Sequence, residues 1–362
     1  MIHTADVRIT LTEHDYQCIL QEYGQTKNSR HFRIRDFAAD GLTDVRLYTF
    51  MANNITRYYL RVTANLAHVL TGRYDPLALY DGSDFQILAG NFEALMASVT
   101  AMPLPPLSQW TTCRIDYAYD AKLEPDKYVG TPADYVALAK RGLLPQQAVL
   151  VEKEGWMSCR EENGSVRINC YDKEAEIQQR QYPFDEDVCD RARNVLRFEV
   201  QCLAPKLKCL VRNAKGSGRS IEFFISADLW RQIISEYGHR VIGEEPYFSI
   251  LHASLFLRKC AVAPTGKKLR SDVVVNLLDF IKAIDTAGGL GAAINSWKQQ
   301  KAIHIRWTKT DKNILLNDSQ RRSRMRQLRQ LNVNPLPVPT EMNKFKLANP
   351  LQDFWDNLRT TK

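Results

Sequence analysis

Polar and apolar residues alternate along much of the first two thirds of the chain, a period-2 pattern that is typical of strands with one buried face. Between these segments, apolar residues recur at helical spacing. The alternation predicts strands over 5–10, 45–50, 55–63, 111–119, 165–171 and 195–202. The helical spacing predicts helices near 84–99, 132–143, 172–182 and 227–237, the last with Ser226 as its N-cap and Gly238 as its end.

The chain changes character at 213–220, "NAKGSGRS", which predicts a loop or linker. Beyond it the pattern is mostly helical, over 248–260, 272–286, 291–300 and 317–331, and is followed by the extended "NVNPLPVP". Because regular helices do not separate the strands, we expect an α+β fold and not a doubly wound parallel sheet. The length favours two domains, which we place at 1–212 and 221–362.

Composition limits the class of protein. The 362 residues are 44% hydrophobic, but charges interrupt every apolar run, and the N-terminus lacks the apolar stretch of a signal peptide. The eight cysteines are scattered and form no C-x-x-C, so we expect free thiols and neither zinc nor disulfides. The sequence therefore predicts a cytoplasmic protein that has no membrane partner.

Positive charge is concentrated near the C-terminus. The chain carries a net charge of +8, and the stretch from Lys301 to Gln330 contains nine Lys or Arg and two Asp. Such a run is either a solvated helical face or disordered tail, or a surface that contacts nucleic-acid phosphates. We favour the second interpretation, with Arg321, Arg322, Arg324 and Arg326 as DNA-binding candidates.

Three of the predicted strands each have one polar face. Alternation puts Arg114 with Asp116, Arg167 with Tyr171, and Arg197 with Glu199 on such faces. If the three strands are neighbours, Asp116, Glu199 and Tyr171 converge on one open sheet face.

That set has a chemical meaning. Two carboxylates on rigid strands can hold Mg²⁺ or Mn²⁺, which polarises a phosphodiester, and a nearby tyrosine can attack the phosphorus. Arginines and a lysine would neutralise the charge that develops on the phosphate. The residues alone leave a second interpretation open, in which R-x-D and R-x-E are ion pairs on a solvated sheet face.

The order of three short motifs adds a resemblance. The chain contains R-I-D (114–116), C-Y-D-K-x-x-E (170–176) and L-R-F-E-V (196–200) in this order. It resembles replication initiators of the filamentous-phage gene II/X type and related plasmid rolling-circle initiators. The segments 62–72 and 321–339 are also similar to that family, although His68 stands where the family usually has lysine.

The resemblance implies a site-specific nickase that initiates rolling-circle replication of a phage or plasmid. Its nucleophile would be Tyr171, its metal ligands Asp116 and Glu199, and its phosphate contact Lys173, with Arg197 supporting the carboxylates or binding phosphate. The first domain would be an antiparallel-sheet nuclease core of the RRM-like or HUH-endonuclease-like kind, and the second a helical, basic DNA-binding region. The partners would be origin DNA, single-stranded or supercoiled duplex, and a host helicase and polymerase.

Some details depart from the wider class of such nucleases or stay open. The seven histidines include no H-x-H metal pair, so the metal site is either carboxylate-based or completed by a distant histidine. The candidates for the third protein ligand are Glu176 and Asp120, and Asp120 is less favoured because it can already lie in the turn. Tyr182 lies eleven residues after Tyr171, where a second catalytic tyrosine would fall on the same helical face. If a helix starts directly after Asp172, we expect Lys173 to turn away from Tyr171.

Rival functions are less consistent with the sequence. A tyrosine recombinase needs H-x-x-R and a late tyrosine, but no histidine has Arg at +3 and no tyrosine follows Tyr247. The segments 263–268 and 287–294 lack the full P-loop and G-x-G-x-x-G patterns. A non-catalytic DNA- or RNA-binding regulator stays open, since the aromatic and basic residues of 55–63 could stack on bases in an RRM-like way.

Overall fold

The computed structural model describes most of the chain. The described residues are 1–25, 30–34, 37–143, 148–153, 156–179, 185–216, 218–259, 266, 268–307 and 311–360, with side chains described outside 148–162. They form two compact units. Unit 1 comprises Met1–Tyr119, Asn163–Arg167 and Glu199–Ile234, and unit 2 comprises Asp120–Glu162, Ile168–Phe198 and Ser235–Lys362.

The fold is α+β, as the sequence predicts. Among the described residues, nine strands form the main sheet in the order β2-β3-β4-β1-β5-β9-β8-β7-β6. The three strands with predicted polar faces, β5 (Thr111–Lys122), β9 (Val195–Leu203) and β8 (Val166–Asp172), are neighbours in this order. The division into units falls within each of these three strands and within helix α9 (Ala227–Val241).

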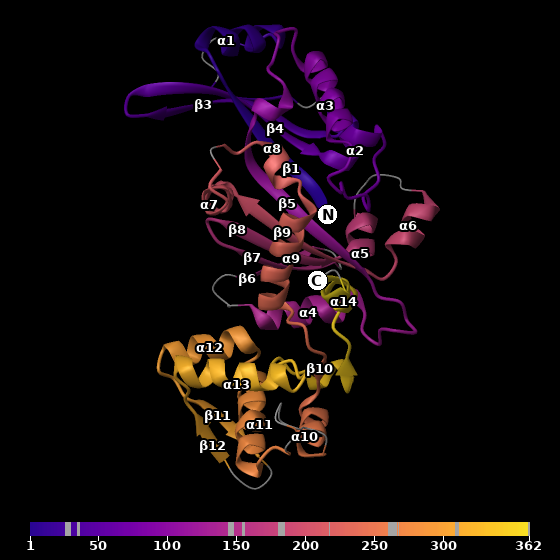
Figure 1. Cartoon of the computed structure of the whole chain (residues 1–362), viewed down its shortest axis with the longest axis vertical. Helices are drawn as coiled ribbons and strands as arrows, with labels where there is room; N and C mark the ends of the chain where they lie inside the picture. The colour runs from indigo at the N-terminus through magenta and orange to yellow at the C-terminus, as the bar shows by residue number, and fades with distance from the viewer. Residues whose placement is uncertain are drawn as a thin grey trace. The chain divides into compact units, whose positions relative to one another are not determined.

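Unit 1 is built on antiparallel strands (Figure 1). These are β1 (Ile2–Leu11), β2 (His31–Ile34), β3 (Leu42–Ala52), β4 (Ile55–Asn65) and the first part of β5. The two-residue turn between β3 and β4 places Asn53 and Asn54 at φ of 51° and 59°, the left-handed conformation that a type I′ hairpin requires and that asparagine tolerates. Its helices are α1 (Glu13–Glu22), α2 (Leu66–Thr71), α3 (Phe85–Val99), α7 (Ala204–Asn213) and α8 (Ile221–Phe224), with short 3₁₀ turns at Ala38–Asp40 and Leu107–Gln109.

Strand alternation gives the unit 1 sheet two different faces. On one face, Val7, Val62 and Val45 are cross-strand neighbours and fully buried. Helix α1 packs on this face, where Tyr16 lies 5.1 Å from Tyr58 between ring centroids. The other face carries polar side chains, including those of Asp116 and its strand neighbours.

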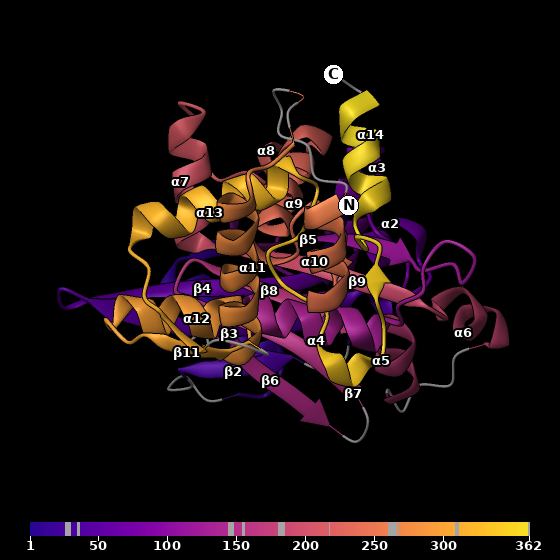
Figure 2. The same ribbon diagram turned by 90° about the horizontal axis from the view of Figure 1, so that it is seen from below.

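Unit 2 contains a hairpin, further short strands and many helices. Its elements are α4 (Pro132–Gly142), β6 (Ala148–Lys153), β7 (Trp156–Glu162), α5 (Lys173–Gln179), α6 (Glu186–Ala192), β10 (Tyr247–Phe248), α10 (Ile250–Lys259), α11 (Ser271–Thr286), α12 (Leu290–Lys298), β11 (Ile303–Arg306), β12 (Asp311–Ile314), α13 (Asp318–Gln330), a 3₁₀ turn at Thr340–Met342, β13 (Lys346–Leu347) and α14 (Gln352–Thr360). Helix α11 contacts α12, α13 and β11, and these elements lie together in both ribbon views (Figures 1 and 2).

The basic C-terminal segment is folded, so its interpretation as a disordered tail is wrong. Buried Asp279 of α11 accepts hydrogen bonds from Trp307 Nε1 and Lys312 Nζ, both at 2.8 Å. Trp297 Nε1 donates to the Ile314 carbonyl oxygen at 2.9 Å. The region after residue 220 is also less purely helical than predicted, because it contains the β10–β13 and β11–β12 pairs.

Helix α9 shows one confirmed and one wrong prediction about helix ends. Ser226 Oγ accepts the backbone N–H of Leu229 at 3.2 Å, as expected of an N-cap. The helix does not end at Gly238 but continues to Val241. A Cβ at residue 238 would lie 3.0 Å from a side-chain carbon of Leu351 and 3.4 Å from Trp355, so this glycine allows close packing beside α14.

Candidate functional site

The two predicted metal-binding carboxylates lie close together in unit 1. Asp116 on β5 and Glu199 on β9 are 2% and 4% exposed. The side-chain amide of Gln201 donates to Glu199 Oε1 at 2.9 Å and is 3.5 Å from Asp116 Oδ2. One N–H₂ group therefore lies between both carboxylates.

Arg114 holds the Asp116 carboxylate in place. Its Nε and one terminal nitrogen donate to the two Asp116 oxygens, each at 2.9 Å, in the forked geometry that arginine makes with carboxylates. Burial nevertheless raises the pKa of Asp116 to about 8; Arg114 opposes this shift, whereas Glu199 and Asp6 add to it by charge repulsion. The site thus brings two acidic groups together in a place shielded from water, where burial favours the protonated form of Asp116.

This donor set fits a hard divalent cation in part. Carboxylate oxygens are the ligands that Mg²⁺ and Mn²⁺ prefer, and a cation would offset the repulsion between Asp116 and Glu199. His3 Nδ1 lies 3.7 Å from Glu199 Oε2 and 3.0 Å from Thr4 Oγ1. Across the described residues, no three His, Cys, Asp or Glu side chains are grouped to hold a metal. A cation here would need water or phosphate oxygens to complete its shell, which is usual for Mg²⁺.

The predicted nucleophile and its lysine lie in unit 2, at the junction of β8 and α5. Tyr171 is the penultimate residue of the strand, and the helix begins at Lys173, after Asp172. Asp172 Oδ1 accepts the backbone N–H of Ala175 at 3.2 Å, which caps the first turn. The change from alternating to charged residues in the sequence therefore marks a real strand-to-helix junction.

The expectation that an immediate helix start would turn Lys173 away is wrong. Its Nζ lies 5.8 Å from the centroid of the Tyr171 ring, within the range of a cation–π contact. The four-carbon stem of lysine places its ammonium independently of the backbone direction. Lys173 Nζ also donates to Glu176 Oε2 at 2.6 Å, so this candidate third metal ligand is engaged in an ion pair.

The other candidate third ligand, Asp120, is paired with Arg197. Arg197 Nε and one of its terminal nitrogens donate to the two Asp120 carboxylate oxygens, each at 2.6 Å. Arg197 is completely buried, while the Asp120 side chain is 21% exposed. Arg197 therefore supports a carboxylate, but it is Asp120 that it holds. The remaining strand arginine, Arg167, is half-buried on β8.

The polar side chains of β5, β8 and β9 that form the candidate site are not on an open face, contrary to the sequence prediction. Asp116, Glu199 and Lys173 are all buried, and Tyr171 is 8% exposed. Charged side chains can be buried when ion pairs and hydrogen bonds satisfy them, and an alternating pattern does not distinguish this case from a solvated face. For the same reason, the interpretation of R-x-D as a solvent-face ion pair is wrong: the Arg114–Asp116 pair exists, but Asp116 is buried.

The four candidate arginines of α13 differ in their surroundings. Arg321 is buried; it pairs with Asp318 and donates to the Leu316 carbonyl oxygen at 3.0 Å. Arg324 is half-buried, and burial lowers its pKa. Arg322 and Arg326 are exposed and four residues apart, so they share one helix face. Two of the four candidates are thus placed where a DNA phosphate could reach them directly.

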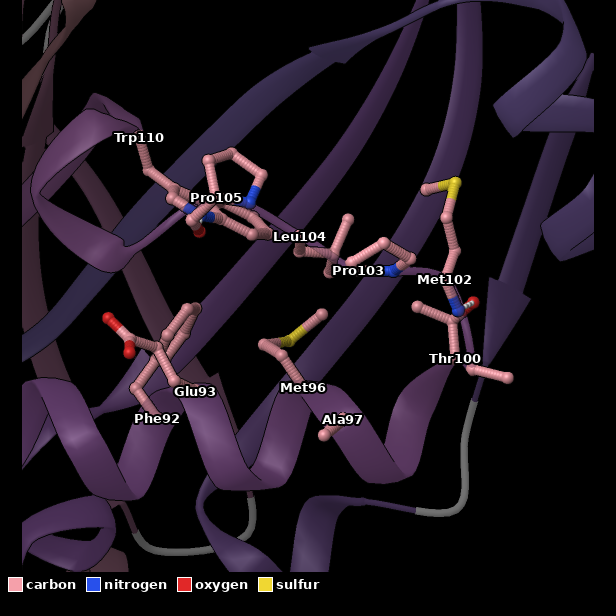
Figure 3. A pocket seen from close by; sticks show the side chains of 11 residues that line it. Phe92, Glu93, Met96, Ala97, Thr100, Met102, Pro103, Leu104, Pro105 and Trp110 are labelled. Carbon is pink, nitrogen blue, oxygen red and sulfur yellow. Dashed lines mark hydrogen bonds between the residues drawn. The ribbon is translucent and has the colours of Figure 1, made fainter.

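Other sequence candidates do not enter the site. Tyr182 and most of 263–268 lie outside the described residues. A pocket of about 270 Å³ lies in unit 1 between α3 and the segment 100–110 (Figure 3). Its polar groups are already engaged, since Glu93 accepts the Leu107 N–H and Trp110 Nε1 donates to the Pro105 carbonyl oxygen, both at 3.0 Å. This pocket offers space and no catalytic group of the predicted kind.

Sequence reasoning missed two members of the carboxylate cluster. Gln201 lies two residues after Glu199 on the same strand face, which alternation alone could have indicated. His3 precedes the first predicted strand, and only the pairing of β1 with β5 brings this end of the chain beside Asp116. That pairing joins residues more than 100 positions apart, and no local pattern predicts it.

Comparison with known proteins gives limited information. No protein-family model matches the chain, and no curated protein matches it significantly. Among solved structures, the chain is similar to a rolling-circle replication initiator protein from Geobacillus stearothermophilus, at 10% identity over 67% of this chain and 84% of that one. The TM-score of 0.32 is too low for this likeness to establish a shared fold. Within the part of the chain that the structure describes, no helix combines the length and apolar character that crossing a membrane requires.

Proposed function

We propose that the chain is a metal-dependent enzyme that nicks and rejoins single-stranded DNA and so initiates rolling-circle replication. The observation that carries the proposal is the buried pair of Asp116 and Glu199, which share one amide donor on neighbouring strands. Two acidic side chains buried side by side repel each other when both are ionised, and a divalent cation between acidic side chains is one arrangement that relieves such repulsion. The order of the sequence motifs supports the same function.

The chemistry would be a transesterification. Tyr171 Oη would attack the phosphorus, the bond to the 3′ oxygen would break, and that oxygen would take up a proton while the tyrosine releases one to water. The product would hold the 5′ phosphate on Tyr171 and leave a 3′-OH to prime synthesis, and the reverse reaction would rejoin the strand. One phosphoester bond replaces another, so the step needs no nucleotide cofactor.

The residues have separate roles in this proposal. Asp116 and Glu199 would hold Mg²⁺ or Mn²⁺, with Arg114 fixing the orientation of Asp116. Lys173, whose ammonium lies against the Tyr171 ring, would favour the phenolate as it forms. A bound divalent cation would supply Lewis-acid polarisation of the phosphodiester. Exposed Arg322 and Arg326 on α13 would add phosphate contacts with origin DNA.

The decisive experiment maps a covalent adduct. Supercoiled DNA of the replicon that encodes the chain would be incubated with the full-length protein and Mg²⁺ or Mn²⁺, and the linked peptide sequenced. We expect the adduct on Tyr171 and its complete loss in Tyr171→Phe. Tyr135→Phe is a matched control, since Tyr135 is also buried and its hydroxyl donates to the Ala348 carbonyl oxygen. An adduct on another residue, Tyr182 included, contradicts the assignment, as does wild-type nicking by Tyr171→Phe.

A second experiment tests the carboxylates. Asp116→Asn and Glu199→Gln keep the side-chain shape but remove charge, so both should raise the Mg²⁺ concentration needed for half-maximal nicking. The control is Asp81→Asn, an aspartate in a loop of unit 1 that bonds Ser83. If both carboxylate variants nick normally at limiting Mg²⁺, Asp116 and Glu199 are structural.

A further inference from the structure

Four arginines form a row across the polar face of the unit 1 sheet. Arg33 on β2 is the cross-strand partner of Arg46 on β3, Arg46 of Arg61 on β4, and Arg61 of Arg8 on β1. Residues directly opposite each other on neighbouring strands project from the same face. Neighbouring strands lie about 4.8 Å apart, so the row spans about 14 Å. In the sequence these residues are 13 to 25 positions apart, and no linear motif reveals them.

This arrangement is unfavourable for the fold on its own. Like charges directly opposite each other destabilise a sheet. Asp44 pairs with Arg33 and Arg46, and Asp6 pairs with Arg61, so two carboxylates stand against four guanidinium groups. The row keeps an excess of positive charge, and a polyanion would be its complement.

Aromatic rings lie beside the arginine row on the same face. His31 and Tyr48 are cross-strand partners, as are Tyr48 and Tyr59. The His31 and Tyr48 rings are nearly parallel, with an interplanar angle of 4° and centroids 6.3 Å apart, and Tyr48 and Tyr59 follow at 5.1 Å. Arg8 joins the two rows, because its guanidinium lies 4.6 Å over the Tyr59 ring and donates to Tyr48 Oη at 3.2 Å.

Part of this surface is accessible. The side chains of Arg33, Arg46 and Arg61 are 49%, 52% and 40% exposed, and His31 is exposed as well. The next residue on this face of β3, Phe50, is 57% exposed, so its ring is accessible to a stacking base. Helix α1 packs on the opposite face, against Tyr58, and leaves these side chains uncovered.

We propose that this face binds single-stranded nucleic acid, with phosphates along the arginine row and bases stacked on His31, Tyr48 and Phe50. Stacking requires unpaired bases, which a duplex does not present, so the combination of charge and rings selects a single strand. The β3–β4 hairpin that carries two of these rings extends from the unit as a long ribbon (Figure 1).

The face continues to the carboxylates, which links the inference to the proposed function. Asp116 is the cross-strand partner of Thr4, and Arg8 lies four residues further along β1 on the same face. At about 3.4 Å per residue, the two positions are about 14 Å apart along the strand. A nucleic-acid strand held by the arginine row would therefore lie on the same sheet face as Asp116. Only this link between the binding face and Asp116 rests on the proposed nicking activity.

The test measures binding without catalysis. A fluorescein-labelled oligodeoxythymidine of about a dozen nucleotides would be titrated with the full chain in EDTA at several salt concentrations, followed by anisotropy. The double variant Arg33→Gln/Arg46→Gln should lower the log–log salt slope by about 1.4 and weaken binding about 25-fold at 0.1 M salt. The control Arg73→Gln/Arg212→Gln removes the same charge from exposed positions of unit 1 outside this face and should bind like wild type.

A second pair of variants tests stacking. His31→Ala should weaken binding at least about fivefold, whereas His14→Ala, on exposed α1, should not. An unchanged salt slope in Arg33→Gln/Arg46→Gln overturns the proposal, and so does a loss confined to a duplex probe. Because EDTA prevents nicking, the binding assay is independent of the adduct experiment. If no adduct forms, the binding result still stands. If the adduct forms but the variants bind the oligonucleotide like wild type, only the proposal for this sheet face fails.

Discussion

The clearest physical prediction concerns the stability of the metal-free protein as a function of pH. Burial raises the pKa of Asp116 from its ordinary 3.8 to about 8. Between these values the folded chain keeps a proton on Asp116, while the unfolded chain does not. The folded state therefore loses stability as the pH rises through this window, and the full stabilisation is present only below the unfolded pKa.

The magnitude follows from the width of the window. Each pH unit in which the folded state binds one extra proton changes the free energy of unfolding by about 1.4 kcal/mol. Between pH 5 and pH 8 the loss levels off as the folded pKa is reached, which gives about 3 to 4 kcal/mol in total. Asp116→Asn removes this titration. The amide also gives up one hydrogen bond from Arg114, at a cost of about 1 kcal/mol that does not depend on pH.

The assay is urea denaturation in EDTA at pH 5, 6, 7 and 8 and constant ionic strength, with the difference between wild type and Asp116→Asn plotted against pH. Histidine titrations are common to both proteins and cancel. Asp272→Asn is the control, since hydrogen bonds from Arg270 lower the pKa of this exposed carboxyl and its titration ends below the window. If the difference in unfolding free energy between wild type and Asp116→Asn does not change with pH, Arg114 keeps Asp116 ionised throughout the window. The reasoning would then be refuted.

Two further predictions concern the ion pairs and the basic helix. Asp120→Asn leaves the Arg197 charge buried without its carboxylate, so it should lower the free energy of unfolding by about 3 to 5 kcal/mol, measured by urea denaturation. A loss under 1 kcal/mol would contradict this role. Arg322→Gln/Arg326→Gln should reduce the salt slope of duplex-DNA binding by about 1.8 without changing the melting temperature, whereas Arg258→Gln should leave it unchanged. If Arg258→Gln reduced the salt slope by as much, the effect would come from the net charge of the chain and not from contacts made by α13.

The elements of this fold were largely predictable because their signals are local. Period-2 alternation identified β3, β4, β5, β8 and β9, and apolar spacing identified α3, α4, α11 and α13, each within a few residues. The helices that the sequence analysis missed are α1, α2, α6, α7, α8 and α14, none of them longer than ten residues. Short helices give a weak periodic signal because they contain only about one to three turns. Gly238 was wrongly predicted to end α9. It lies inside the helix and allows close packing against Leu351 and Trp355, which are distant in sequence.

The candidate site was predictable in composition but not in environment. The strand order β5-β9-β8 confirms that the three polar strands are neighbours. Their burial did not follow from the sequence, because alternation reports which residues share a face and not what covers that face. The partner of Arg197 was also unpredictable: Glu199, two residues away, was as plausible as Asp120, and cross-strand geometry decided between them.

Burial also changes how the charge of the chain should be interpreted. A linear window draws attention to α13, where four arginines fall within six residues, yet Arg321 is buried and Arg324 half-buried. A sheet spreads its charged residues over distant segments, so no single window contains the arginine row across β2, β3, β4 and β1, although the row holds four arginines in space. Since a polyanion responds to charge in space, the sheet face of unit 1 is at least as strong a candidate for nucleic-acid binding as the basic helix. The two surfaces are separable experimentally, because stacking aromatics accompany the sheet row and should make it selective for single strands, while the exposed α13 arginines can contact duplex phosphates as well.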